Sequence, residues 1–117
     1  MSDIQEIELS RDVAKETIAI AKSLTKLQKN RDFSLAIMKG YFEDEATRLI
    51  NLLSDPSINE AAKADVMESL KAISHFKRYI RDRYTFANMA EKALIDYEEA
   101  LVEARNADES EADDADY

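Results

Sequence analysis

Apolar side chains recur along most of this sequence at the three- and four-residue steps that mark one face of an α-helix. Between residues 11 and 29 the repeat steps by four, three, four and three through Val13, Thr17, Ile20, Leu24 and Leu27. Ser10 precedes the repeat and is a candidate N-cap. The pattern predicts a first helix over residues 11–29 with this heptad-like face in the core. Residues 1–9 before it are predicted to form a loosely ordered arm, or a strap of one or two turns.

A second helix is predicted after "KNRD", with Asp32 as its cap and an apolar face of Met38, Phe42, Ala46, Leu49 and Leu53. Gly40 lies inside this helix, where glycine costs about 1 kcal/mol relative to alanine. We therefore expect Gly40 either to let another backbone pack closely or to mark a kink. Pro56 ends the helix, and the S-x-x-E sequence of residues 57–60 predicts a capping box for the next one.

No glycine or proline follows Glu60, and one apolar stripe continues at about 3.5 residues per step, the spacing of coiled coils. Its members are Val66, Leu70, Ile73, Phe76, Ile80, Tyr84, Ala87, Ala90, Leu94, Tyr97 and Leu101. The fold class is therefore all-α, with a single helical domain over residues 10–105.

Two all-α architectures fit this pattern. In the first, a helical hairpin packs on the front half of a long, coiled-coil-like C-terminal helix. The back half, about residues 84–105, then overhangs and buries its stripe on another subunit, which makes Ala87, Ala90, Leu94, Tyr97 and Leu101 a candidate oligomer interface. In the second, the helix breaks near residue 84, at "RDRYT", and four shorter helices form a compact bundle.

The composition agrees with few, short connections. The chain has one glycine and one proline in 117 residues, whereas sheet proteins need both in their turns. It has no cysteine, which excludes disulfides and thiolate chemistry. No apolar run approaches the roughly 20 residues of a membrane span, and the acidic N-terminus lacks the pattern of a signal peptide. We expect a soluble, intracellular protein without a membrane partner.

The charge is unevenly distributed. The net charge is −9, of which residues 98–117 carry −8, so the rest of the chain is close to neutral. Residues 106–117 have no apolar periodicity and are predicted to form a disordered acidic tail. This charge balance argues against nucleic acid as the partner.

Basic residues gather in the middle of the third helix, as a candidate basic patch of Lys71, Lys77, Arg78, Arg81 and Arg83. Aromatic residues interleave with them, which is also seen in nucleic-acid binders. Because Tyr84 belongs to the apolar stripe, we interpret the patch as a protein-binding or intramolecular surface, with the acidic tail as one candidate contact. Phosphate contact is the weaker alternative.

No arrangement of residues indicates catalysis. His75 is the only histidine, and its helical neighbours Lys71 and Arg78 supply no carboxylate or nucleophile. The acids at residues 43–45 form neither a di-iron E-x-x-H pair nor a calcium loop, and Arg48 can pair with them on a solvated helix face. The sequence therefore predicts no enzyme, no metal and no cofactor.

Several short sequences are similar to those of a known group of proteins. They are Arg31-Asp32-Phe33, Gly40-Tyr41-Phe42, Glu45-Ala46-x-Arg48-Leu49, Asp55-Pro56, Lys71-Ala72-Ile73 and Phe76-Lys77-x-Tyr79. Over roughly residues 30–105 the chain resembles small helical proteins of tailed bacteriophages, often encoded among structural or assembly genes. The resemblance implies a viral protein that acts by interaction, in the host cytoplasm or in the virion.

These observations together predict a non-enzymatic, oligomeric helical protein, a virion component or assembly factor whose partners are proteins. The alternative is a small phage inhibitor that blocks a host enzyme or defence system through its acidic C-terminal part. A nucleic-acid-binding packaging factor that uses the basic patch is a third possibility, which the charge balance disfavours.

Overall fold

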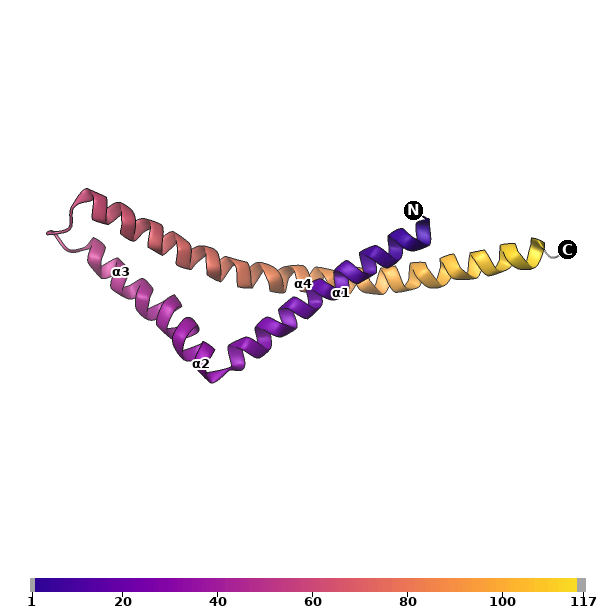
Figure 1. Cartoon of the computed structure of the whole chain (residues 1–117), viewed down its shortest axis with the longest axis horizontal. Coiled ribbons are helices and arrows are strands. Elements are labelled where there is room, and N and C mark those ends of the chain that lie inside the picture. Colours follow the sequence, from indigo (N-terminus) through magenta and orange to yellow (C-terminus); the bar gives the residue numbers. More distant parts are fainter. Residues whose placement is uncertain (1, 116–117) are drawn as a thin grey trace. The chain divides into compact units, whose positions relative to one another are not determined.

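The computed structural model describes residues 2–115, and within this range every element is helical (Figure 1). The helices are α1 (Asp3–Lys29), α2 (Arg31–Phe33), the π-helix η1 (Ser34–Glu45), α3 (Ala46–Leu53) and α4 (Glu60–Ala115). The predicted all-α class is confirmed. The long C-terminal helix is confirmed too, because α4 continues through residue 84 without a break. The four-helix alternative, which required that break, is wrong.

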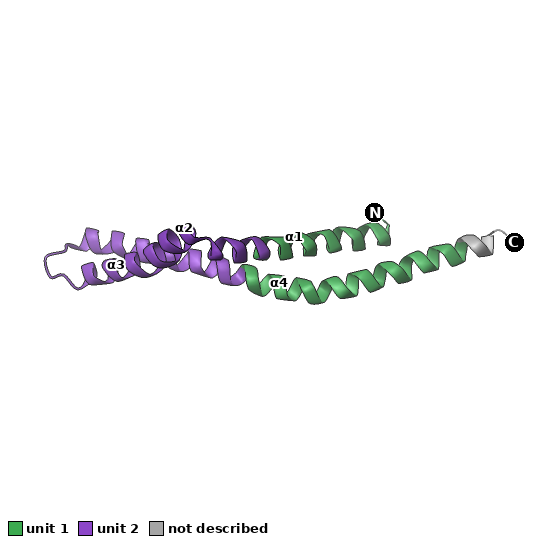
Figure 2. Ribbon diagram, turned by 90° about the horizontal axis from the view of Figure 1, so that it is seen from below, with its two compact units in different colours: residues 1–21, 83–117 green, residues 22–82 purple. Residues whose placement is uncertain are grey.

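The helices form two compact units, whereas the sequence predicts one domain (Figure 2). Unit 1 contains residues 1–21 and 83–117, so it pairs the start of α1 with the later part of α4. Unit 2 contains residues 22–82, so it includes α2, η1, α3 and the first part of α4. Helix α4 therefore supplies residues to both units, with different partners in each.

Helix α1 begins eight residues earlier than the sequence predicts. Ser2 and Gln5 form a reciprocal capping box, in which the Ser2 amide donates to Gln5 Oε1 (3.1 Å) and the Gln5 amide to Ser2 Oγ (3.2 Å). The prediction of a loose arm over residues 1–9, with Ser10 as the cap, is therefore wrong. The S-x-x-Q signal was present at residues 2–5, and it satisfies amide groups that would otherwise have no partner at the helix start.

The junction after α1 is capped by Asn30 instead of the predicted Asp32. Asn30 has an extended backbone (φ −69°, ψ 128°), and its side chain accepts a hydrogen bond from the Phe33 amide at 3.0 Å. The helix that follows widens into η1, whose turns bond from i to i+5. This widening was not predicted.

The turn between α3 and α4 lies around Pro56, as predicted, but different residues cap it. Asp55 Oδ1 accepts hydrogen bonds from the Ser57 amide (2.9 Å) and hydroxyl (2.7 Å), and these bonds hold the pKa of Asp55 below its usual value. Asn59 then caps α4, because its Oδ1 accepts from the Ala62 amide at 2.8 Å. The predicted Ser57–Glu60 capping box is therefore wrong, since Ser57 is engaged by Asp55.

Unit 2 has a core of large side chains. Phe42 of η1 and Leu49 of α3 are buried, as are Val66, Ile73 and Ile80 on the first part of α4. The rings of Phe42 and Phe76 lie 5.1 Å apart, centroid to centroid, and Tyr41 meets Phe76 edge-on at 6.4 Å. These contacts join η1 to α4. The apolar stripe predicted for the second helix therefore packs against the stripe predicted for the third.

Unit 1 has a core of small side chains. The buried residues of α1 are Ala14, Ile18 and Ala21, and those of the later part of α4 are Ala87 and Leu101. The heptad-like face predicted as the core of α1 is largely outside it, since Val13, Ile20 and Leu27 are all exposed. Two apolar stripes share this helix, and the one with alanines faces α4, because small side chains allow two helices to approach closely.

The acidic C-terminal region is helical as far as Ala115, where the sequence predicts a disordered tail from residue 106. Residues 116 and 117, the last two of that predicted tail, lie outside the described residues. Half of residues 106–115 are alanine or glutamate, which are strong helix formers. An existing helix also extends through them without a new nucleation cost, so like charge alone does not end α4 at residue 106.

Candidate protein-interaction surface

The stripe predicted as an oligomer interface lies instead against α1. Ala87 is 5% exposed and Leu101 is 1% exposed, and Ala90, Leu94 and Tyr97 are half-buried. Arg105 of α4 also reaches Glu8 of α1, at 3.4 Å between Nη2 and Oε1. The prediction that this stripe lacks a partner within its own chain is therefore wrong, because α1 starts at Asp3 and is long enough to cover it.

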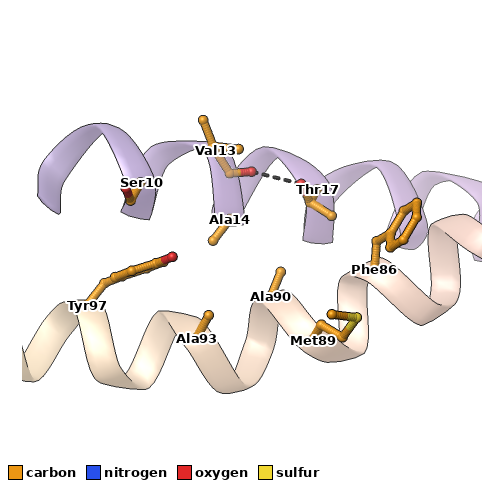
Figure 3. Close-up of a pocket in the computed structure, with 9 residues that line it drawn as sticks. All are labelled: Ser10, Val13, Ala14, Thr17, Phe86, Met89, Ala90, Ala93 and Tyr97. Carbon is orange, nitrogen blue, oxygen red and sulfur yellow. Dashed lines mark hydrogen bonds between the residues drawn. The ribbon is translucent and has the colours of Figure 1, made fainter. Parts of the chain in front are cut away.

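Beside this buried stripe, unit 1 leaves an open apolar groove of about 320 Å³ (Figure 3). Helix α1 contributes Ser10, Val13, Ala14 and Thr17 to it. Helix α4 contributes Phe86, Met89, Ala90, Ala93 and Tyr97. We call these nine residues the groove. Its lining carries no charged side chain, so it suits an apolar protein surface better than a polar small molecule.

The groove joins members of two predicted sets with residues that the prediction missed. Ala90 and Tyr97 belong to the predicted interface stripe, and Val13 and Thr17 to the predicted core face of α1. Met89 was not singled out, and Phe86 was noted only as an aromatic residue beside the basic patch, although both are large apolar residues next to the stripe. Their signal was the three- and four-residue spacing of Phe86, Met89 and Ala93, a second apolar row on α4.

Gly40 has no close contact with another helix. A Cβ built at Gly40 would lie 3.1 Å from the backbone oxygen of Leu35, and the described residues place no other such atom within 4 Å of it. Gly40 was predicted to pack closely against another backbone, and within this chain that prediction is wrong. The approaching backbone belongs to its own helix, because the wide π turn brings the carbonyl five residues back beneath it.

The predicted basic patch is divided, and its members already have neighbours. Lys71 pairs with Glu68 at 3.2 Å, Arg81 lies 3.9 Å from Asp82, and Arg78 Nη2 lies 2.7 Å from His75 Nδ1. The Lys77 ammonium lies 5.7 Å from the centroid of the Phe42 ring. Arg83 belongs to unit 1, where its guanidinium carbon lies 4.8 Å from the Phe86 ring. All of these contacts are made within the chain.

The acidic run at residues 43–45 lies on an exposed helix face, as predicted. Arg48 donates to both carboxylate oxygens of Glu45, a pairing that lowers the pKa of Glu45 and raises that of Arg48. Lys39 pairs with Asp44 at 2.9 Å, and the hydrogen bond raises the pKa of Lys39. Exposed pairs of this kind add little to stability, and nothing in them resembles an acid–base site.

Among the described residues, no cluster of three or more histidine or carboxylate side chains is arranged to hold a metal ion. No helix in the described part of the chain is long and apolar enough to cross a membrane.

Comparisons with known proteins do not place the chain in a family. It matches no protein-family model, no curated protein and no solved structure among those compared. The interpretation of its function therefore depends on its own residues.

Proposed function

We propose that this chain is a non-enzymatic helical interaction protein that works as an oligomer. The observation that carries the proposal is the groove of unit 1, where large apolar side chains remain exposed around a floor of alanines. Met89 is 62% exposed, Val13 is 56% exposed and Phe86 is 44% exposed. Neighbouring apolar residues exposed in this way are typical of protein–protein contact surfaces.

Tailed bacteriophages supply the context of the proposal. The short sequences between residues 31 and 79 resemble those of small helical phage proteins, often encoded among structural or assembly genes, and this resemblance implies a role by interaction. We therefore propose a virion component or an assembly factor, made in the host cytoplasm. An all-helical chain with an open apolar groove suits a role in assembly.

The test of this function is the mass of the protein in solution. Size-exclusion chromatography with light scattering, at low micromolar protein and about 0.15 M salt, gives the mass independently of shape. The proposal expects a discrete oligomer. A single species at the 13.3 kDa mass of one chain, unchanged as the concentration is raised tenfold, would contradict it.

A second candidate function has one observation in its favour. The acidic side chains between Glu98 and Glu111 are exposed on a regular helix. Fixed acidic surfaces of this kind compete with nucleic acid for basic grooves, so an inhibitor of a host enzyme or defence system is the alternative.

Deletion of residues 106–117 separates the two functions. An inhibitor that acts through its acidic end should lose its effect on a bacterial host that expresses it. The assembly function expects the deleted chain to keep the number of subunits of the full chain, because the groove lies outside the deletion.

A further inference from the structure

The groove of unit 1 contains both protrusions and hollows. Its floor is made of alanines, Ala14 from α1 and Ala90 and Ala93 from α4, which lie between the two helices in Figure 3. Its rims carry larger apolar side chains, with Val13 on α1 and Phe86 and Met89 on α4. A surface that presents large residues next to small ones can fit against a copy of itself, since each rim finds the hollow of the other copy.

The spacing of the groove residues also suits packing against a second copy of the chain. Met89 and Ala93 are four residues apart on α4, and Ser10, Val13 and Thr17 step by three and four on α1. Helices with this spacing pack together with side chains of one fitting between side chains of the other. In an interface with two-fold symmetry the same patch serves both partners, so it has to be complementary to itself.

We infer that the groove is the docking site for a second copy of this chain, and that the two copies pair with antiparallel α4 helices. The pairing brings together α1 and α4 of both copies as four helices around one shared core. It is a specific form of the oligomer proposed above, and it rests on that proposed function. It also covers the large apolar side chains at the rims of the groove, which a single copy leaves exposed.

The order of charges along α4 sets the direction of the pairing. Basic residues, among them Arg78 and Arg81, precede the groove residues 86–97, and acidic residues from Glu98 onward follow them. A parallel pair would place the acidic segment of one copy beside that of the other. An antiparallel pair directs each acidic segment toward the basic segment of the partner, and opposite charges favour that orientation.

The test compares two single substitutions on α4, followed by light scattering over a dilution series. Met89→Lys places a charge in the groove, and Ile95→Lys is the matched control outside it, because the two side chains are equally exposed, at 62% and 61%. We expect Met89→Lys to raise the dissociation constant of the dimer at least about tenfold, which corresponds to about 1.4 kcal/mol. We expect Ile95→Lys to leave it within about threefold of the unmodified chain.

The results distinguish a wrong surface from a wrong function. If the unmodified chain is an oligomer and Met89→Lys does not weaken it, or Ile95→Lys weakens it equally, the groove is not the docking site while the oligomer stands. If the unmodified chain is a monomer, both proposals fail. Circular dichroism of both variants checks that the helices are intact, and Val13→Lys repeats the test from α1, with Val102→Lys as its control at 56% and 57% exposure.

The absence of native cysteine allows a test of direction. Ala93→Cys lies in the groove, and Ala104→Cys lies three turns farther along α4 on the same side. An antiparallel pair with its two-fold axis at the groove forms a disulfide between copies at residue 93 but not at residue 104. A parallel pair forms it at both positions, and that result would overturn the proposed direction.

Discussion

The two units of this protein use the same long helix in different ways. In unit 2, α4 meets large side chains from η1 and α3, and the aromatic rings of Tyr41, Phe42 and Phe76 fill the contact. In unit 1, α4 meets α1 through Ala14, Ala21 and Ala87, and the larger residues are left at the rims of the groove. One unit fills its own interior, while the other places two helices close together and leaves its apolar rims uncovered.

This difference separates stability from interaction. Burial of large apolar side chains is the main favourable contribution to folding, and alanines contribute little of it. Unit 2 therefore has the larger share of the folding energy of a single chain. Unit 1 gains more when a partner covers its groove, which is why we place the docking surface there. The predictions below test this comparison, from the largest expected effect to the smallest.

Phe42→Ala should give the largest loss of stability. Phe42 is 5% exposed at the centre of the unit 2 core, and removal of such a ring costs about 3–5 kcal/mol in free energy of unfolding. Chemical denaturation followed by circular dichroism measures the loss. Leu35→Ala, at an exposed position of the same helix η1, is the control and should stay within about 0.5 kcal/mol. A loss below about 1 kcal/mol for Phe42→Ala would contradict the assignment of this core.

Ala87→Leu should destabilise unit 1, because it adds a large side chain to the core of that unit, whereas Phe42→Ala removes one from the core of unit 2. The added side chain has no room between α1 and α4, and overpacking of this kind costs about 1–3 kcal/mol. Hydrogen exchange should show faster exchange in residues 3–21 and 83–111, with little change in unit 2. Ala19→Leu, at an exposed position of α1, should leave exchange unchanged. A neutral Ala87→Leu variant would show that the helices do not need small residues to pack.

Gly40 provides a smaller test, made on unit 2. Alanine at this position gains about 1 kcal/mol in helix propensity, which offsets the crowding of its Cβ against the Leu35 oxygen. We expect Gly40→Ala to change the free energy of unfolding by less than about 1 kcal/mol, and Gly40→Leu to agree with it within about 0.5 kcal/mol. A leucine variant much less stable than the alanine variant would show that another helix, or another copy, packs on Gly40.

Asp55 should give the smallest effect, and a pH-dependent one. Hydrogen bonds from Ser57 hold the pKa of Asp55 below its ordinary value of 3.8, so the ionised carboxylate stabilises the folded state. That contribution is present above pH 3.8 and is lost as the pH falls through the lower pKa of the folded state. The urea midpoint of Asp55→Ala should therefore lie below that of the unmodified chain at pH 6. The difference in urea midpoint between the two proteins should be smaller at pH 3 than at pH 6. A difference that is the same at both pH values would rule out a contribution from the ionised Asp55 carboxylate.

How much could be predicted differs between the two ends of the chain. On α4 the predicted stripe contains every buried residue in the described part of the helix, namely Val66, Ile73, Ile80, Ala87 and Leu101, because its regular spacing keeps them on one face. On α1 the same reasoning selected Val13, Ile20 and Leu27, and the structure buries Ala14, Ile18 and Ala21. Hydrophobic scales favour the larger residues, whereas close helix packing favours the smaller ones.

The caps show a similar division. Residues 2–5 carried a readable capping box, and the turn at Pro56 was located correctly. The choice among Asn30, Asp32, Ser57 and Asn59 as caps depended on which side chain was already hydrogen-bonded, as Ser57 is to Asp55. Several polar residues near one helix start are equivalent in sequence, and the local backbone conformation decides between them.

The sequence alone determined that the chain is all-α and that an apolar stripe runs from Val66 to Leu101, because periodicity is a local property. Only the tertiary structure decided that α1 covers the back stripe of α4. This contact leaves Val13, Phe86 and Met89 around an open groove. Helix α1 has two apolar stripes, and the one that packs more closely on α4 becomes buried. Because α4 is far from α1 in the sequence, the local pattern of α1 does not show which stripe this is.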